Sequence, residues 1–161
     1  STPPDARAPR FIAPRALSSC IPSITSTAMS PPPTAAPDTL FVVNFWSTWC
    51  KPCIAELPEF DDFHRMVSNK PIKVLLVSVD DIKDRAKTEA FIGKRNLVAE
   101  VVLLNESKPQ EWINWVSPEW SGAIPATLFV RSGTGTRKIY ETTFTSSDLR
   151  DTISANGWGE L

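Results

Sequence analysis

Two cysteines at the junction of a predicted strand and a predicted helix constrain the fold of this chain more than any other feature. Leu40 to Trp46 (LFVVNFW) is a dense β-branched and aromatic run, typical of a buried strand. Cys50 and Cys53 follow, and Pro52 between them suits the first turn of a helix, where a missing N–H costs nothing. Apolar residues then recur at helical spacing, at Ile54, Leu57, Phe60, Phe63 and Val67.

The rest of the chain predicts an alternation of strands and helices. Such alternation implies a parallel core sheet covered by helices, and a final hairpin adds an antiparallel edge. We therefore expect the α/β class, with a central mixed but mostly parallel sheet flanked by helices. The predicted strands are 73–79, 101–104, 127–131 and 138–142, and the predicted helices beyond the first are 84–94, 110–116 and 147–155, the last capped by Ser146 or Ser147.

The amino-terminal part of the chain differs from the rest in composition. Nine of the 15 prolines lie in residues 1–37, which contain no glycine and no apolar run with a helix or strand period. Proline fixes φ and removes backbone donors, so this composition favours extended, solvated conformations. We expect residues 1–37 to be a disordered tail or tether and residues 38–161 to form one domain. Cys20 follows Leu17-Ser18-Ser19, which resembles the end of a lipoprotein signal; the alternative is an incidental thiol.

Charge and cysteine count exclude several classes of protein. A net charge of -1 argues against a general nucleic-acid binder, which needs a basic face. Three cysteines are too few for a disulfide scaffold. A zinc site at Cys50 and Cys53 needs two more ligands, and the candidates are Cys20 and His64. His64 lies ~16 Å farther along the same predicted helix, so it cannot share a metal with the pair unless the helix breaks.

The position of the two thiols favours redox chemistry over metal binding. A helix amino terminus presents free N–H groups and partial positive charge, which stabilise a thiolate. Cys50, expected to be the more exposed, is the predicted nucleophile. Cys53 is the predicted resolving thiol, which attacks the mixed disulfide that Cys50 forms.

Two separated motifs then indicate a family. The segment Phe45 to Cys53 (FWSTWCKPC) resembles the active-site signature of the thioredoxin superfamily. With Ile54 to Pro58 (IAELP) it reads WCxPCxxExP, which resembles the TlpA/ResA branch of thiol–disulfide oxidoreductases. Ile124 to Thr127 (IPAT) resembles the cis-proline loop of the same family. The resemblance covers about residues 38–156.

The resemblance implies roles for individual residues. Trp49 would flank the disulfide, and Ile124 and Pro125 would form the loop that faces it and pairs with an extended substrate. Lys51 and Pro52 would tune the reduction potential. No cofactor is expected besides the Cys50–Cys53 disulfide itself.

Two polar residues near the motif have further expected roles. Glu56 would influence proton movement at the cysteines; the alternative is a solvated first-turn carboxylate that offsets the helix dipole. Thioredoxins proper carry a buried Asp in the preceding strand, and here that position is Asn44, which cannot accept a proton. This departure agrees with the ResA-like branch and leaves Glu56 or water as the base.

The predicted function is dithiol–disulfide exchange with thiol proteins, as a reductase in a periplasmic or otherwise exported compartment. Its predicted partners are those proteins and a membrane or exported electron donor, with no nucleic acid, and the chain would be monomeric. One interpretation of Cys20 is that it is lipidated and tethers the chain to a membrane through the tail. The alternative from another class is a non-catalytic binding module whose CxxC holds a metal or a partner. A thiol peroxidase is less favoured because Thr48-Trp49-Cys50 lacks the pattern of that branch.

Three other groups are assigned structural roles. The acidic pairs Asp61-Asp62 and Asp80-Asp81 are expected to be solvated helix ends rather than cation ligands. Trp112, Trp115 and Trp120 are expected to bury apolar area around the inserted segment that contains them; the alternative is that one of them lines the substrate groove.

Overall fold

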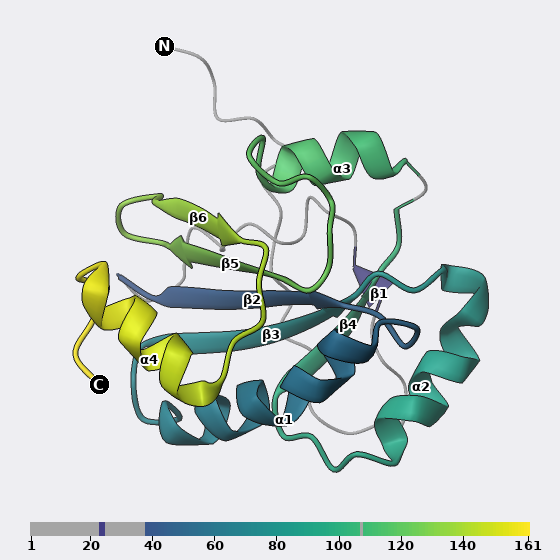
Figure 1. Cartoon of the computed structure of the whole chain (residues 1–161), viewed down its shortest axis with the longest axis horizontal. Helices are drawn as coiled ribbons and strands as arrows, with labels where there is room; N and C mark the ends of the chain where they lie inside the picture. Colours follow the sequence, from purple (N-terminus) through teal and green to yellow (C-terminus); the bar gives the residue numbers. More distant parts are fainter. Residues whose placement is uncertain (1–22, 25–37, 107) are drawn as a thin grey trace.

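The computed structural model describes residues 23–24, 38–106 and 108–161, and they form one six-stranded sheet with helices on both faces (Figure 1). Most predicted elements are present within one or two residues of their expected ends, and a short 3-10 helix precedes the second helix. The elements in chain order are β1 Ser23–Ile24, β2 Leu40–Trp46, α1 Lys51–Met66, β3 Ile72–Ser78, the 3-10 helix Ile82–Asp84, α2 Arg85–Gly93, β4 Glu100–Leu104, α3 Pro109–Val116, β5 Ala126–Arg131, β6 Arg137–Tyr140 and α4 Ser146–Ala155.

The sheet is mixed, and its strand order is β1-β4-β3-β2-β5-β6. β2 pairs in parallel with β3, and β3 pairs in parallel with β4. On the other side, β5 runs antiparallel to β2 and β6 runs antiparallel to β5. This arrangement confirms the predicted fold class. The carboxyl ends of β2, β3 and β4 therefore meet at one edge of the sheet, and the loop after β2 leads there to Cys50.

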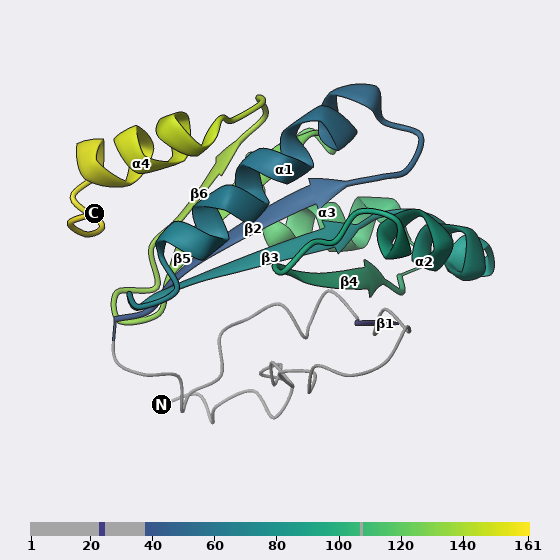
Figure 2. The same ribbon diagram turned by 90° about the horizontal axis from the view of Figure 1, so that it is seen from below.

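Alternate residues of β2 enter two separate cores. Val42 and Trp46 belong to the cluster that includes the apolar side of α1 and residues of α4. Phe41, Val43 and Phe45 belong to the cluster on the other face, which α3 covers. Figure 2 shows α1 and α4 together on one side of the sheet. Burial on both faces explains why β2 is apolar without alternation.

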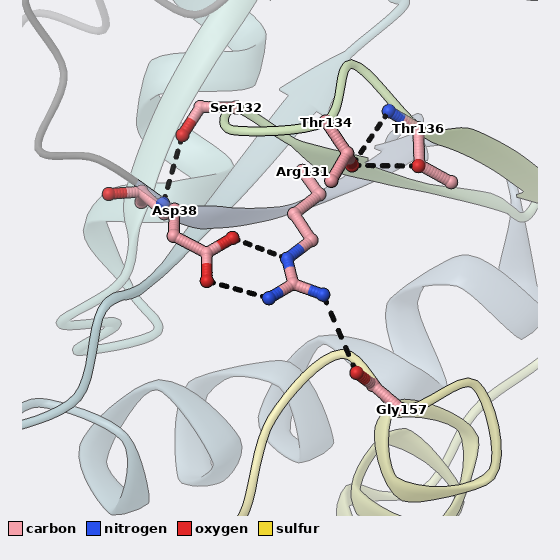
Figure 3. A network of polar contacts seen from close by, with 7 residues as sticks. Asp38, Arg131, Ser132, Thr134, Thr136 and Gly157 are labelled. Atoms are coloured by element: carbon pink, nitrogen blue, oxygen red, sulfur yellow. Dashed lines mark hydrogen bonds and ion pairs between the residues drawn. The ribbon is translucent and has the colours of Figure 1, made fainter.

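A polar clamp holds the start of β2 against the end of β5 (Figure 3). Asp38 has a positive φ of 69° and pairs through both carboxylate oxygens with Arg131. Arg131 also donates to the carbonyl of Gly157 at 3.4 Å, and the N–H of Thr39 donates to Ser132 Oγ at 2.9 Å. The guanidinium lowers the pKa of Asp38. These contacts join Asp38, the predicted first residue of the domain, to the carboxyl-terminal end of the chain.

Two features of the fold differ from expectation. Ser23 and Ile24 lie inside the predicted tail, yet they pair in parallel with Leu103 and Leu104. The rest of that predicted tail, including Cys20, lies outside the described residues. The other difference is the cap of α4.

The predicted cap of α4, Ser146 or Ser147, was wrong. Thr145 caps this helix, because its side chain accepts the N–H of Asp148 at 3.1 Å while Asp148 accepts the N–H of Thr145 at 2.9 Å. This reciprocal pair is a capping box, although the residue at its third position is Asp rather than the usual Glu or Gln.

Candidate active site

Cys50 and Cys53 form a disulfide at the amino terminus of α1. Their Cα atoms lie 5.3 Å apart. The N–H of Cys50 donates to the carbonyl of Ser47 at 3.3 Å, which turns the chain from β2 into the helix. Cys50 is the N-cap, Lys51 and Pro52 occupy the first two helical positions, and Pro58 is accommodated farther along the helix.

The amino terminus of α1 is directed at the sulfur of Cys50. The Sγ of Cys50 accepts the backbone N–H of Cys53 at 3.4 Å. Cys50 is 7% exposed, whereas Cys53 is fully buried. An N–H group and the positive end of the helix therefore act on the more accessible sulfur, where they would stabilise a thiolate once the disulfide is reduced.

The other residues of the motif surround this disulfide. Trp49 is 69% exposed, the most exposed of the large apolar side chains among the described residues. Lys51 and Pro52 are exposed beside it. The peptide bond between Ile124 and Pro125 is cis, and Ile124 packs against the core cluster that contains both cysteines. Ile124 thus packs against both core clusters, one of which contains the two cysteines.

Glu56 is buried and hydrogen-bonded, so the alternative of a solvated first-turn carboxylate is wrong. It is 3% exposed and lies one helical turn beyond Cys53. Its Oε1 accepts from Asn44 Nδ2 at 2.8 Å and its Oε2 accepts from the N–H of Phe144 at 2.9 Å. Burial raises the pKa of Glu56 to about 7, although the hydrogen bonds from Phe144 and Asn44 favour the ionised form.

Asn44 lies in β2 under the same turn of the helix. Its Nδ2 also donates to Thr127 Oγ1 at 3.3 Å, while its Oδ1 has no hydrogen-bond partner among the described residues. The network therefore joins β2, α1 and β5. It holds one titratable group, with a pKa of about 7, one helical turn from Cys53.

Asp80 was missed as a site residue, since it was expected to be a solvated helix end. It is 5% exposed. Its carboxylate accepts the N–H of Thr48 at 3.1 Å, the hydroxyl of Thr48 at 2.7 Å and the hydroxyl of Ser78 at 2.6 Å. Asp80 thereby fixes the loop that carries Trp49 and Cys50. The only sequence signal was its position, two residues after β3, at the sheet edge where β2 ends.

A cavity of about 480 Å³ opens at this edge of the sheet. Trp49 forms one wall, and the loops after β3 and β4 form the others. No group of three or more His, Cys, Asp or Glu side chains within the described ranges is arranged to hold a metal ion. In the same ranges, every helix is too short or too polar to cross a membrane.

Comparisons with known proteins agree with this geometry. The thiol–disulfide oxidoreductase ResA of Geobacillus thermodenitrificans is 24% identical over 113 residues, which are 70% of this chain and 60% of that protein. The chain thus spans about 60% of the length of this relative. The match agrees with the branch that the WCxPCxxExP motif indicated.

Solved structures share the fold. StoA from Bacillus subtilis matches with a TM-score of 0.56 and 22% identity, over 78% of this chain and 85% of that one. A secreted thiol-disulfide isomerase from Corynebacterium glutamicum matches with a TM-score of 0.58 and 20% identity, over 70% and 67%. The predicted thioredoxin-like fold is confirmed. The model of the AhpC/TSA family matches residues 33–135, and the chain belongs to this family.

Proposed function

We propose that this protein is a thiol–disulfide oxidoreductase that reduces disulfides of protein substrates through Cys50. The observation that carries the proposal is the position of Cys50 Sγ, which caps a helix and is the more exposed sulfur of the pair. The name of the ResA relative supports the same activity.

The reaction takes two exchange steps. In the reduced protein, the Cys50 thiolate attacks a substrate disulfide, a Cys50–substrate disulfide forms, and one substrate thiolate leaves. The Cys53 thiolate then attacks Cys50 Sγ, so that the Cys50–Cys53 disulfide forms and the second substrate thiolate leaves. Two electrons pass to the substrate, and a dithiol donor must reduce the pair again.

Each surrounding residue has a proposed task in these steps. Glu56 takes and returns the proton of Cys53, one helical turn away, because a group with a pKa near 7 exchanges protons readily at neutral pH. Trp49, Ile124 and Pro125 contact the substrate segment around its cysteine. Lys51 and Pro52 set the potential of the pair.

The proposed setting is an exported compartment, with a membrane or exported dithiol as the electron donor. Secretion of the Corynebacterium glutamicum isomerase supports this placement. A compartment in which protein disulfides form is also one in which a disulfide reductase finds substrates.

Insulin reduction with dithiothreitol as donor tests the activity. We expect the wild type to accelerate precipitation of the insulin B chain, and Cys50→Ser to abolish the acceleration. Cys20→Ser is the matched control, because it removes a thiol outside the pair and should leave the rate unchanged. Equal inactivity of the wild type and Cys50→Ser, together with stoichiometric metal binding, would favour the binding module. Hydrogen peroxide consumption that depends on Cys50 would favour the peroxidase.

A further inference from the structure

The loop that leads to the cis bond before Pro125 is held by an indole group. This loop connects α3 to β5 and consists of residues 117–125. Trp120 lies within it and is 4% exposed, and its Nε1–H donates to the carbonyl oxygen of Ala123 at 2.9 Å. A buried indole N–H usually has a hydrogen-bond partner, and here the partner is the peptide group directly before Ile124. Trp120 therefore does more than bury apolar area.

The ring of Trp120 packs on the strand that leads to Cys50. Its centroid lies 4.6 Å from that of Phe45 in β2 and 5.5 Å from that of Trp112 in α3. All three rings belong to the same buried cluster. Close packing in a core holds each side chain in one orientation. The indole N–H therefore has a fixed direction relative to β2, and the turn that carries Cys50 follows β2.

A second set of contacts holds the other side of Ala123. Its N–H donates to Ser121 Oγ at 3.3 Å, and the N–H and hydroxyl of Ser121 both donate to Oε1 of Glu141. Gly122 between them has a φ of 91°, and a Cβ there would lie 2.9 Å from Cδ1 of Ile113 on α3. Glycine suits both this backbone conformation and this close approach. Both peptide groups that flank Ala123 are thus held in place.

The orientation of the Ala123–Ile124 peptide decides where the N–H of Ile124 points. This peptide is trans, because the cis bond among the described residues is the next one along the chain. In a planar trans peptide the carbonyl and the N–H point in opposite directions. Since the carbonyl of Ala123 is turned to the indole, the N–H of Ile124 points away from it. That N–H makes no hydrogen bond within the described part of the chain, so it is a donor available to a partner.

We propose that Trp120 is a positioning residue for substrate binding, which holds the Ala123–Ile124 peptide so that the N–H of Ile124 can pair with the backbone of an extended substrate segment. The inference rests on the proposed function, in which Ile124 contacts the substrate, and adds the group that orients it. Main-chain hydrogen bonds of this kind bind extended segments of many sequences. Trp120 acts through the loop and takes no part in the exchange of the sulfur atoms.

Two disulfides, one with and one without a peptide backbone, test the proposal. The first is a symmetric dimer of a short, uncharged peptide that is linked through a central cysteine. The second is oxidised mercaptoethanol, a small disulfide with no peptide group. The measurement is the second-order rate constant for the reduction of each disulfide by the full-length protein, reduced beforehand. The ratio of the peptide rate constant to the small-disulfide rate constant reports on binding of the backbone, because both reactions use the same cysteines.

Trp120→Phe keeps an aromatic ring in the cluster and removes the indole donor. We expect this variant to lower the rate constant for the peptide about fivefold to tenfold, the scale of one hydrogen bond, and to change that for the small disulfide less than about twofold. The ratio of the two rate constants should therefore fall.

Trp115→Phe is the matched control. Trp115 lies on α3, is 37% exposed, and its ring centroid lies 5.3 Å from the guanidinium of Arg137, so this substitution removes an indole outside the loop. Ser121→Ala is a second variant, because it releases the N–H of Ala123 at an exposed position and leaves the aromatic cluster intact. We expect the ratio to keep its wild-type value in Trp115→Phe and to fall about twofold or more in Ser121→Ala.

The outcomes separate this inference from the proposed function. An unchanged ratio in Trp120→Phe would overturn the inference alone, and so would an equal fall of the ratio in Trp115→Phe. Equal losses with both disulfides in Trp120→Phe would also overturn it, because the variant would then disturb the cysteines rather than the binding of a backbone. If Trp120→Phe failed to fold, the ratio in Ser121→Ala would decide in the same way. If the wild type reduced neither disulfide, the proposed function would be contradicted and the inference would fall with it.

Discussion

Asn44 Nδ2 donates a 2.8 Å hydrogen bond to Oε1 of Glu56, and both side chains are buried under the first turns of α1. Asn44 on β2 occupies the position at which thioredoxins proper carry a buried Asp. Its amide holds the carboxylate of Glu56 on α1. Charge at this site is therefore set by Glu56, whose pKa burial raises to about 7.

Glu56→Gln should remove a pH dependence of stability. Between pH 4.5, the ordinary pKa of Glu, and about 7, the folded wild type holds a proton that the unfolded chain has released. That proton stabilises the fold at low pH, and the contribution is lost as the pH rises through about 7. The free energy of unfolding of the wild type should therefore fall by ~3 kcal/mol relative to the variant between pH 4.5 and 8.

Urea unfolding of both proteins at several pH values provides the measurement. The variant should fold, because its amide can accept from Phe144 and donate to Asn44 Oδ1, which has no partner among the described residues. Parallel curves for the two proteins across this range would contradict the assignment of Glu56 as a buried group of raised pKa.

Asn44→Asp should place two carboxylates in one buried site. Like charges at this separation cannot both ionise at low cost, so the pair would retain a proton at pH 7. We expect a loss of stability that is about 2 kcal/mol larger at pH 8.5 than at pH 5. Thermal unfolding at the two pH values tests it, with Asn105→Asp at the sheet edge as a control for the added charge. The same loss at both pH values would show that the pair does not couple.

Asp80→Ala should loosen the loop before the cysteines. The substitution removes charge-assisted hydrogen bonds to Thr48 and Ser78, at an expected cost of ~3 kcal/mol. Amide hydrogen exchange at residues 47–50 should accelerate more than exchange in β5. Thr48→Val is the milder variant, since it removes only the hydroxyl bond. Unchanged protection of the loop in Asp80→Ala would refute this role.

Substitution of Trp46 should lower the stability of the fold, whereas substitution of Trp49 should affect contact with the substrate. Trp46 is fully buried against α1, so Trp46→Ala should cost ~3–5 kcal/mol in unfolding free energy. Trp49 is 69% exposed, and Trp49→Ala should change stability by less than ~0.5 kcal/mol. Only Trp49→Ala should slow insulin reduction in fully folded protein. A normal rate in that variant would remove Trp49 from the substrate site.

Local sequence patterns predicted most of the fold. A strand that is buried on both faces of the sheet is a continuous apolar run, which can be recognised in the sequence. The run Leu40 to Trp46 was expected as a strand and is β2 with the same bounds. Spacing also predicted α1, since its apolar residues follow the helical period. The short pairing of Ser23 and Ile24 with β4 had no such signature, because two residues cannot show a period.

Polar residues of the site were harder to place. Asp61, Asp80 and Glu56 lie in sequences that suit solvated helix ends, yet all three are buried. Their burial depends on distant backbone groups: Glu56 accepts from Phe144, 88 residues away, and Asp61 accepts from Ala99, 38 residues away. Such partners follow from tertiary packing, which spacing along one helix does not encode.

The cysteine pair was predictable because its chemistry depends on local structure. A strand, a two-residue spacing and a helix start were all visible in the sequence, and the structure places Cys50 as the helix cap. The cavity at the same edge of the sheet was not predictable, since Trp49, Asp81 and Glu106 line one cavity only when β2, β3 and β4 are aligned.

Trapping the exchange intermediate tests the central claim most directly. Cys53→Ser, reduced and mixed with insulin, should accumulate a disulfide to one insulin chain, and peptide mapping by mass spectrometry should place it on Cys50. Cys50→Ser under the same conditions should form no comparable adduct, because Cys53 is buried. An adduct on Cys53 in Cys50→Ser with none on Cys50 in Cys53→Ser would contradict the account.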